Sequence, residues 1–181
     1  MNRYGITGVI DPGGHNLKPS EYAALFEMAE RGNLSLRVAF SALAPRPGRE
    51  RQDFERLIED YSAQKHPLLQ FNGIGEAITW GFYNNNNPTP DQQREFESVA
   101  LWAASKGLRL TIHWNTDLSV HHVLNAFEHV NARHEIKPLR WSVAHPHDAS
   151  RGTIERMHRL GLGWLVQNAG YFAAPSYTSS R

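Results

Sequence analysis

Leu108-Arg-Leu-Thr-Ile-His113 and Leu139-Arg-Trp-Ser-Val-Ala-His145 are two short, largely apolar runs that each end on a histidine. Between them, residues 118–130 repeat apolar side chains at helical spacing. A strand, a helix and a second strand in this order predict two parallel strands joined by a right-handed crossover. We therefore expect strands at 108–112 and 139–144, with the two histidines at their carboxyl ends.

The same alternation extends towards both ends of the chain. Further strands are predicted at 5–10, 34–40, 68–74 and 163–166, and further helices at 20–32, 54–61, 90–106 and 154–160. No linker or change of composition divides these units, so we expect an α/β fold in a single domain, residues 1–181. An open doubly wound sheet and part of an eight-stranded barrel both fit, and periodicity alone does not choose between them.

Composition excludes several classes of protein. The 181 residues carry a formal net charge of +1, which gives no broad basic field for nucleic acid. No apolar run approaches the roughly 20 residues that a membrane helix requires. Cysteine is absent, which removes disulfides, thiolate nucleophiles and cysteine metal sites. The first 14 residues do not resemble a signal peptide, so we expect a cytoplasmic location.

The residues at the predicted strand ends suggest chemistry. Barrels of this kind place their active sites at the carboxyl ends of the strands. Read in chain order, these positions hold Asp11, Ser41, Glu76, His113, His145 and Gln167. Imidazole and carboxylate are common zinc ligands, so we predict that Glu76, His113 and His145 converge on one metal ion.

Several local motifs, taken together in their order and spacing, resemble one known family. They are Gly5-Ile-Thr-Gly-Val-Ile-Asp11, Leu110-Thr-Ile-His113, Val123-Leu-Asn-Ala-Phe-Glu128, Leu139-Arg-Trp-Ser-Val-Ala-His145, Ile154-Glu-Arg-Met157, Leu160-Gly-Leu-Gly163 and Val166-Gln167. The chain resembles the amidohydrolase superfamily, in particular the family that includes N-substituted formamide deformylases. The resemblance implies a partial TIM-type (β/α) barrel of about six parallel strand-helix units, running from the second strand to the seventh.

The family pattern also contains parts that this sequence lacks. Such enzymes carry a His-x-His pair on the first strand and, on the eighth, an aspartate that is both metal ligand and general base. Many relatives use a carboxylated lysine on the fourth strand. Here the four lysines, Lys18, Lys65, Lys106 and Lys137, fall in predicted loops or helix ends. Glu76 lies near the corresponding place. The resemblance thus implies Zn²⁺ or another divalent metal for the complete enzyme, and no catalytic residue is assigned to this chain.

The function that follows is that of a fragment of a metal-dependent amidohydrolase, acting on an amide, formamide or related C–N bond of a small molecule. The isolated chain is then expected to show no turnover. The alternative is a non-catalytic binding or interaction protein on a degenerate barrel. An open flavodoxin-like sheet with a phosphate ligand is disfavoured, because no glycine-rich phosphate loop appears. In either of the first two cases, unpaired edges at the first and last strands are expected to promote self-association unless the tail covers one.

Each candidate residue also has an explanation that involves structure alone. Each histidine could hydrogen-bond a loop carbonyl, and Glu76 could cap a segment or pair with an arginine. Asp11 before Pro12 is expected to be a turn residue. His121 and His122 are expected on a helix surface. The aromatic residues after Glu76 could line a pocket or pack the loop; they are Trp80, Phe82 and Tyr83.

Overall fold

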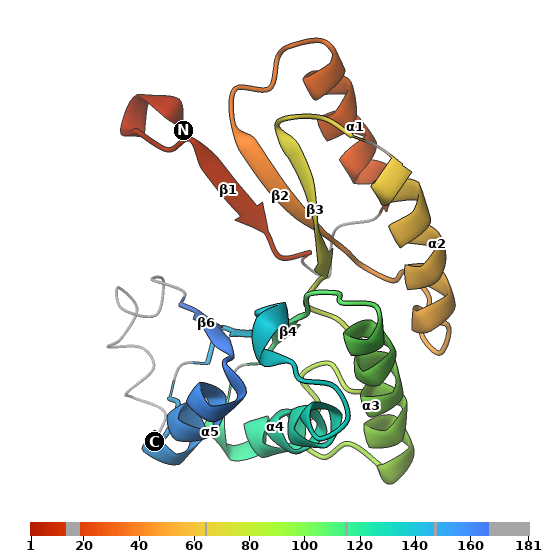
Figure 1. Ribbon diagram of the computed structural model, residues 1–181, viewed down its shortest axis with the longest axis vertical. Helices are drawn as coiled ribbons and strands as arrows, with labels where there is room; N and C mark the ends of the chain where they lie inside the picture. Colours follow the sequence, from red (N-terminus) through yellow and green to blue (C-terminus); the bar gives the residue numbers. More distant parts are fainter. Residues whose placement is uncertain (14–18, 64, 115, 147, 167–181) are drawn as a thin grey trace.

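The computed structural model describes residues 1–13, 19–63, 65–114, 116–146 and 148–166 (Figure 1). In chain order the elements are η1 (Asn2–Tyr4), β1 (Gly8–Asp11), α1 (Pro19–Glu30), β2 (Arg37–Ala42), α2 (Glu50–Ala63), β3 (Leu69–Ile74), α3 (Pro90–Ser105), β4 (Thr111–His113), α4 (Asp117–Asn131), η2 (Lys137–Leu139), β5 (Ser142–Ala144), α5 (Arg151–Leu160) and β6 (Gly163–Leu165). The predicted alternation of strands and helices is confirmed. None of the helices described has the length and apolar character needed to cross a membrane.

The strands form two small parallel sheets, in the orders β1-β2-β3 and β4-β5-β6. One isolated parallel bridge, between Ile74 and Leu110, connects the two sheets. Spatial order therefore follows chain order from β1 to β6. A doubly wound sheet would reverse its strand order at a switch point. Since the described strands contain no such reversal, that architecture is excluded for this part of the chain. The sheets are not closed on each other.

A glycine permits the approach of the two sheets. Gly73 has a φ of 130°, which favours glycine, and a Cβ at this position would overlap the carbonyl oxygen of Arg109. The next residue, Ile74, donates its amide to the same Arg109 oxygen at 2.8 Å. The absence of a side chain at position 73 thus lets β3 reach the segment that leads into β4.

Each sheet is covered by its own aromatic cluster. Beside the first sheet the rings come from Tyr22, Phe26, Phe40, Tyr61 and Phe71. Beside the second sheet they come from Phe82, Phe96, Trp114, Phe127 and Trp141. The Phe82 and Phe96 rings stack with centroids 4.1 Å apart. Both clusters belong to one buried core, which holds the strand ends in place.

Several strands are shorter than predicted at their amino ends. The strand predicted at 139–144 is observed only at Ser142–Ala144, as β5, because residues 137–139 form the turn η2. Pro138 lies in that turn and cannot donate a strand hydrogen bond, and Arg140 follows with a left-handed φ of 58°. Likewise, the left-handed Gly5 ends η1 and delays β1. The carboxyl ends, where the candidate site lies, agree to within about two residues, which is the usual uncertainty of an element boundary.

Candidate metal centre

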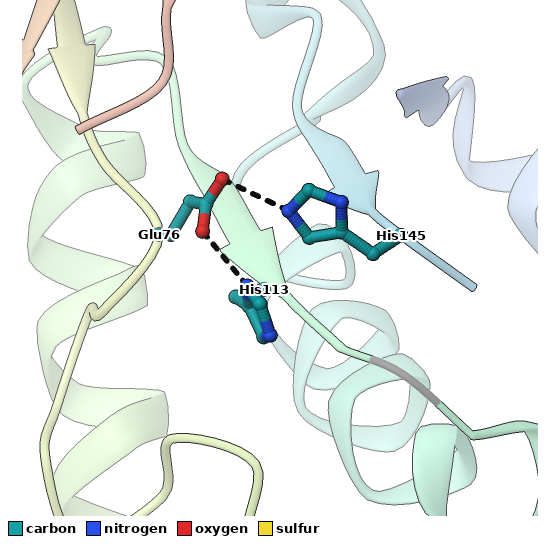
Figure 2. A group of neighbouring side chains, drawn as sticks. All are labelled: Glu76, His113 and His145. Carbon is teal, nitrogen blue, oxygen red and sulfur yellow. Dashed lines mark hydrogen bonds and ion pairs between the residues drawn. The ribbon is translucent and has the colours of Figure 1, made fainter. Parts of the chain in front are cut away.

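The three residues predicted to converge lie together (Figure 2). Glu76 comes from the loop after β3, His113 is the last residue of β4, and His145 follows β5 directly. One potential ligand atom from each lies within 4.8 Å of the other two. It is the single cluster of three such groups within the residues that the structure describes. Consecutive parallel strands bring the residues together because their carboxyl ends share one edge.

The carboxylate of Glu76 lies between the two imidazoles. Its Oε2 is 2.8 Å from Nδ1 of His113, and its Oε1 is 3.2 Å from Nε2 of His145. Burial by itself raises the pKa of Glu76, but the hydrogen bonds and charges of the two histidines outweigh burial, and the net pKa lies below the ordinary value. An ionised carboxylate only accepts hydrogen bonds. Both ring nitrogens are therefore donors in this arrangement.

The backbone fixes both histidines at the ends of the sheet ladder. The amide of His113 donates to the carbonyl of Glu76 at 3.2 Å, and the amide of His145 donates to Leu165 at 3.1 Å. His145 also has a left-handed φ of 69°. For a residue with a side chain this conformation costs roughly 1–2 kcal/mol. The strand thus ends at His145 in a turned conformation, with the imidazole directed at Glu76.

Glycines and a preceding loop fix the position of Glu76. Its amide donates to the carbonyls of Pro12 and Gly13, at 3.1 and 3.3 Å. A Cβ on Gly75 would lie 2.8 Å from Cα of Gly13, too close for any side chain. Only glycine at position 75 allows this loop to pack directly against the segment that carries Glu76. Glu76 itself is buried, with 5% of the residue exposed.

Of the aromatic residues after Glu76, Tyr83 and Trp80 lie on the side of His113, whereas Phe82 lies in the core. The Tyr83 ring lies 5.0 Å from the His113 ring, and the Trp80 ring lies 5.8 Å from Tyr83. The Trp80 indole donates to Ala44 at 2.8 Å, which holds it in place. Burial and the charge of Glu76 raise the pKa of the Tyr83 phenol, which keeps it neutral. Phe82, in contrast, is buried in the core.

Some of the purely structural roles expected for the candidate residues are observed and others are not. Glu76 pairing with an arginine is wrong, since its described side-chain partners are the two histidines. Asp11 as a turn residue is confirmed, because its Oδ1 accepts from the Gly13 amide at 2.9 Å. Of the two histidines expected on the surface of α4, His121 is exposed and His122 is half-buried. Gln167 lies outside the described residues.

The described lysines lie in loops or at element ends, as predicted. Lys65 lies in the loop between α2 and β3, Lys106 caps the carboxyl end of α3, and Lys137 starts the turn η2. Lys18 lies outside the described residues. No described lysine therefore takes the place that a carboxylated lysine holds in many relatives.

Sequence reasoning missed the role of the asparagine run 84–87. The Asn86 side chain accepts from Ser119 at 2.5 Å and so joins the loop after Glu76 to α4. Ser119 also accepts from the indole of Trp114, next to His113. The run of four asparagines could have indicated this role, because asparagine side chains readily form hydrogen bonds with neighbouring backbone and side-chain groups.

The donor set suits a divalent cation. One carboxylate and two imidazoles are a common protein contribution to a zinc site. Nδ1 of His113 and Nε2 of His145 face the carboxylate of Glu76, and a divalent ion held there would replace the protons that these nitrogens share with it. One potential ligand atom from each of the three residues lies within 4.8 Å of the other two, which is close enough for one ion to contact all of them. The residues present therefore fit a metal ion.

Comparison with known proteins identifies the family and agrees with the fold. A family model described as the amidohydrolase family matches residues 1–178. An uncharacterized metal-dependent hydrolase from Pyrococcus horikoshii OT3 superimposes with a TM-score of 0.61 at 16% identity, over 96% of this chain. This chain spans 35% of that protein's length. No curated protein matches the sequence. The match along almost its whole length shows that the chain belongs to the amidohydrolase family.

Proposed function

We propose that Glu76, His113 and His145 bind a divalent metal ion, with Zn²⁺ as the first candidate. The complete enzyme would hydrolyse an amide, formamide or related C–N bond of a small molecule. One observation carries this proposal: a buried carboxylate accepts hydrogen bonds from two histidines that end consecutive strands. Membership of the amidohydrolase family supports the same reaction class.

A metal ion at this place would polarise a substrate carbonyl and lower the pKa of water. The residues of the chain have separate tasks. Glu76 supplies a buried negative charge, and its lowered pKa keeps it ionised at neutral pH. His113 and His145 supply nitrogen ligands of fixed direction. Trp80 and Tyr83 form a wall beside His113, against which a flat substrate group would pack.

We further propose that the fold is part of a (β/α) barrel, from its second strand to its seventh. The sequential strand order and the likeness to about a third of a longer hydrolase support this. The alternative proposal, a binding or interaction protein without catalysis, fits the same fold. The two differ in whether a metal ion binds at the cluster.

Calorimetric titration of the purified chain with Zn²⁺ tests the site. We expect one site whose affinity falls at least about tenfold in His113→Ala or His145→Ala, because each removes a ligand. His129→Ala is the matched control, since His129 is exposed on α4 and pairs with Glu97. Equal affinity in the wild type and both site variants would refute the proposal.

Activity assays separate the chain from the complete enzyme. We expect the chain alone to show no turnover of N-formyl or N-acyl amides with added Zn²⁺, because no general base is assigned to its residues. Turnover that depends on the metal and disappears in His113→Ala would show that this part of the proposal is wrong, although the metal site would stand.

A further inference from the structure

We propose that Asp11 is a positioning residue for Glu76, acting through the turn at Pro12-Gly13 that follows β1. Asp11 is not a member of the three-residue cluster. Its influence would pass through backbone hydrogen bonds across the first sheet. The consequence for metal binding rests on the proposed function, whereas the consequence for the backbone of Glu76 does not.

The first step is the shape of the turn. Asp11 Oδ1 accepts from the amide of Gly13 at 2.9 Å, two residues later in the chain. A side chain that accepts from the backbone two residues on forms an Asx turn. Gly13 has a φ of 77°, in the left-handed region that favours glycine. The carboxylate therefore stabilises a backbone conformation that turns the chain sharply at the end of β1.

The second step is the anchor that fixes the carboxylate. Asp11 Oδ2 accepts from the hydroxyl of Tyr22 on α1 at 3.0 Å. The same hydroxyl lies 3.3 Å from the carbonyl of Ser41 on β2. Tyr22 is 5% exposed and packs against Phe40 with ring centroids 5.1 Å apart. One carboxylate oxygen of Asp11 thus bonds the turn, and the other is held by the buried phenol of Tyr22.

The third step leads to the cluster. The carbonyls at both turn residues, Pro12 and Gly13, accept from the single amide of Glu76. Gly75 packs so closely on the turn that a Cβ at this position would overlap the carbonyl oxygen of Pro12 and the backbone of Gly13. On its other side, the Gly75 amide donates to Ala42 at 2.8 Å. The carboxylate of Glu76 is therefore placed by β2 and by the turn that Asp11 shapes.

Two substitutions at Asp11 separate its hydrogen bonds from its charge. Asp11→Ala removes the acceptor for the Gly13 amide. Asp11→Asn keeps an acceptor oxygen, and asparagine also forms Asx turns. Tyr22→Phe removes only the hydroxyl that anchors the carboxylate, and it remains informative if Asp11→Ala does not fold. Asp60→Ala, on the exposed face of α2, is the matched loss of a carboxylate.

The first measurement is amide hydrogen exchange by NMR on the metal-free full chain. We expect exchange at the Gly13 and Glu76 amides to accelerate about fivefold in Asp11→Ala, which corresponds to the net contribution of one hydrogen bond. Asp11→Asn and Asp60→Ala should leave both rates near the wild type. The Ile74 amide, bonded to Arg109, should not change in any variant. Unchanged exchange at Glu76 in both Asp11→Ala and Tyr22→Phe would overturn the inference.

The second measurement is binding of Co²⁺, followed by its visible absorption spectrum. We expect affinity to fall about tenfold in Asp11→Ala, the lower end of the loss on removing a residue beyond the ligands, with recovery in Asp11→Asn. Absence of binding in the wild type would refute the proposed function and leave the exchange result to decide this inference. Binding in the wild type that is equal in Asp11→Ala, with an identical spectrum, would overturn the positioning role.

Discussion

The two halves of the molecule share an alternation of strands and helices but contribute differently to the site. The first half comprises β1 to β3 with α1 and α2, and the second comprises β4 to β6 with α3 to α5. The first half provides the carboxylate of Glu76 and the turn that supports it. The second half provides both imidazoles. Neither half contains the cluster by itself. The site therefore depends on the junction between β3 and β4 as much as on its own three residues.

The outer strands differ from this junction. Ile74 and Leu110, which bridge the two sheets, are 1% and 0% exposed. Ile10 on β1 is 63% exposed and Trp164 on β6 is 41% exposed. The junction is therefore close-packed, whereas each outer strand presents apolar side chains to solvent. Substitutions at the junction, within each half and at the edges should accordingly have effects of decreasing size.

The largest effect is expected at the junction. Gly73→Val should lower the free energy of unfolding by roughly 4 kcal/mol, because a side chain must overlap Arg109 and adopt a strained φ. Urea unfolding measures this. Gly32→Val is the control, since Gly32 has a φ of 71° but no atom within 4 Å of a Cβ. Equal losses in the two variants would mean that backbone strain alone, rather than packing between the sheets, matters at position 73.

An intermediate effect is expected from the ion pairs within the halves. In the first half, the buried Asp53 carboxylate pairs with Arg46, which holds the pKa of Asp53 below its ordinary value. Since the folded state then binds a proton less readily than the unfolded state, this contribution to stability is complete above the unfolded pKa of about 3.9. It is lost as pH falls through the lower folded pKa. Asp53→Asn should flatten stability in this acidic range, as measured by thermal unfolding between pH 2 and 5, a window set by roughly these pKa values.

The second half offers the comparison for that ion pair. Arg156 holds the pKa of Glu128 below its ordinary value, but the Glu128 side chain is 41% exposed. Solvent screens such a pair, so Glu128→Gln should cost only about 0.5 kcal/mol. A loss of stability in Glu128→Gln as large as that in Asp53→Asn would contradict the view that burial of the carboxylate decides how much each ion pair stabilises the fold.

The smallest effect on stability is expected at the edges. Ile10→Lys and Trp164→Lys place a charge on β1 and β6, where lysine discourages pairing with another strand. Each should change the free energy of unfolding by less than about 0.5 kcal/mol. Light scattering should nevertheless show less self-association than in the wild type. A monomeric wild type with both strands protected from hydrogen exchange would mean that the edges are covered.

Much of the arrangement was predictable from local sequence. The alternation of six strands with helices was predicted, since apolar periodicity and glycine stops are local signals. So was the gathering of Glu76, His113 and His145, because each follows a strand and parallel strands share their carboxyl edge. Their role as ligands, the metal, the substrate and the cytoplasmic location stay predictions. Strand starts were placed too early, because turns such as η2 interrupt apolar runs without changing their composition.

The α/β class, the order of the strands along the chain and the three residues at their ends follow from local patterns in the sequence. The agreement of spatial order with chain order emerges only in the folded structure, because strand pairing is set by contacts between distant segments such as Ile74 and Leu110. The partners of Glu76 likewise emerge only there. Periodicity indicates which face of an element is buried, but the hydrogen bonds from His113 and His145 to Glu76 span 37 and 69 positions of sequence, and only the folded chain brings such distant residues together.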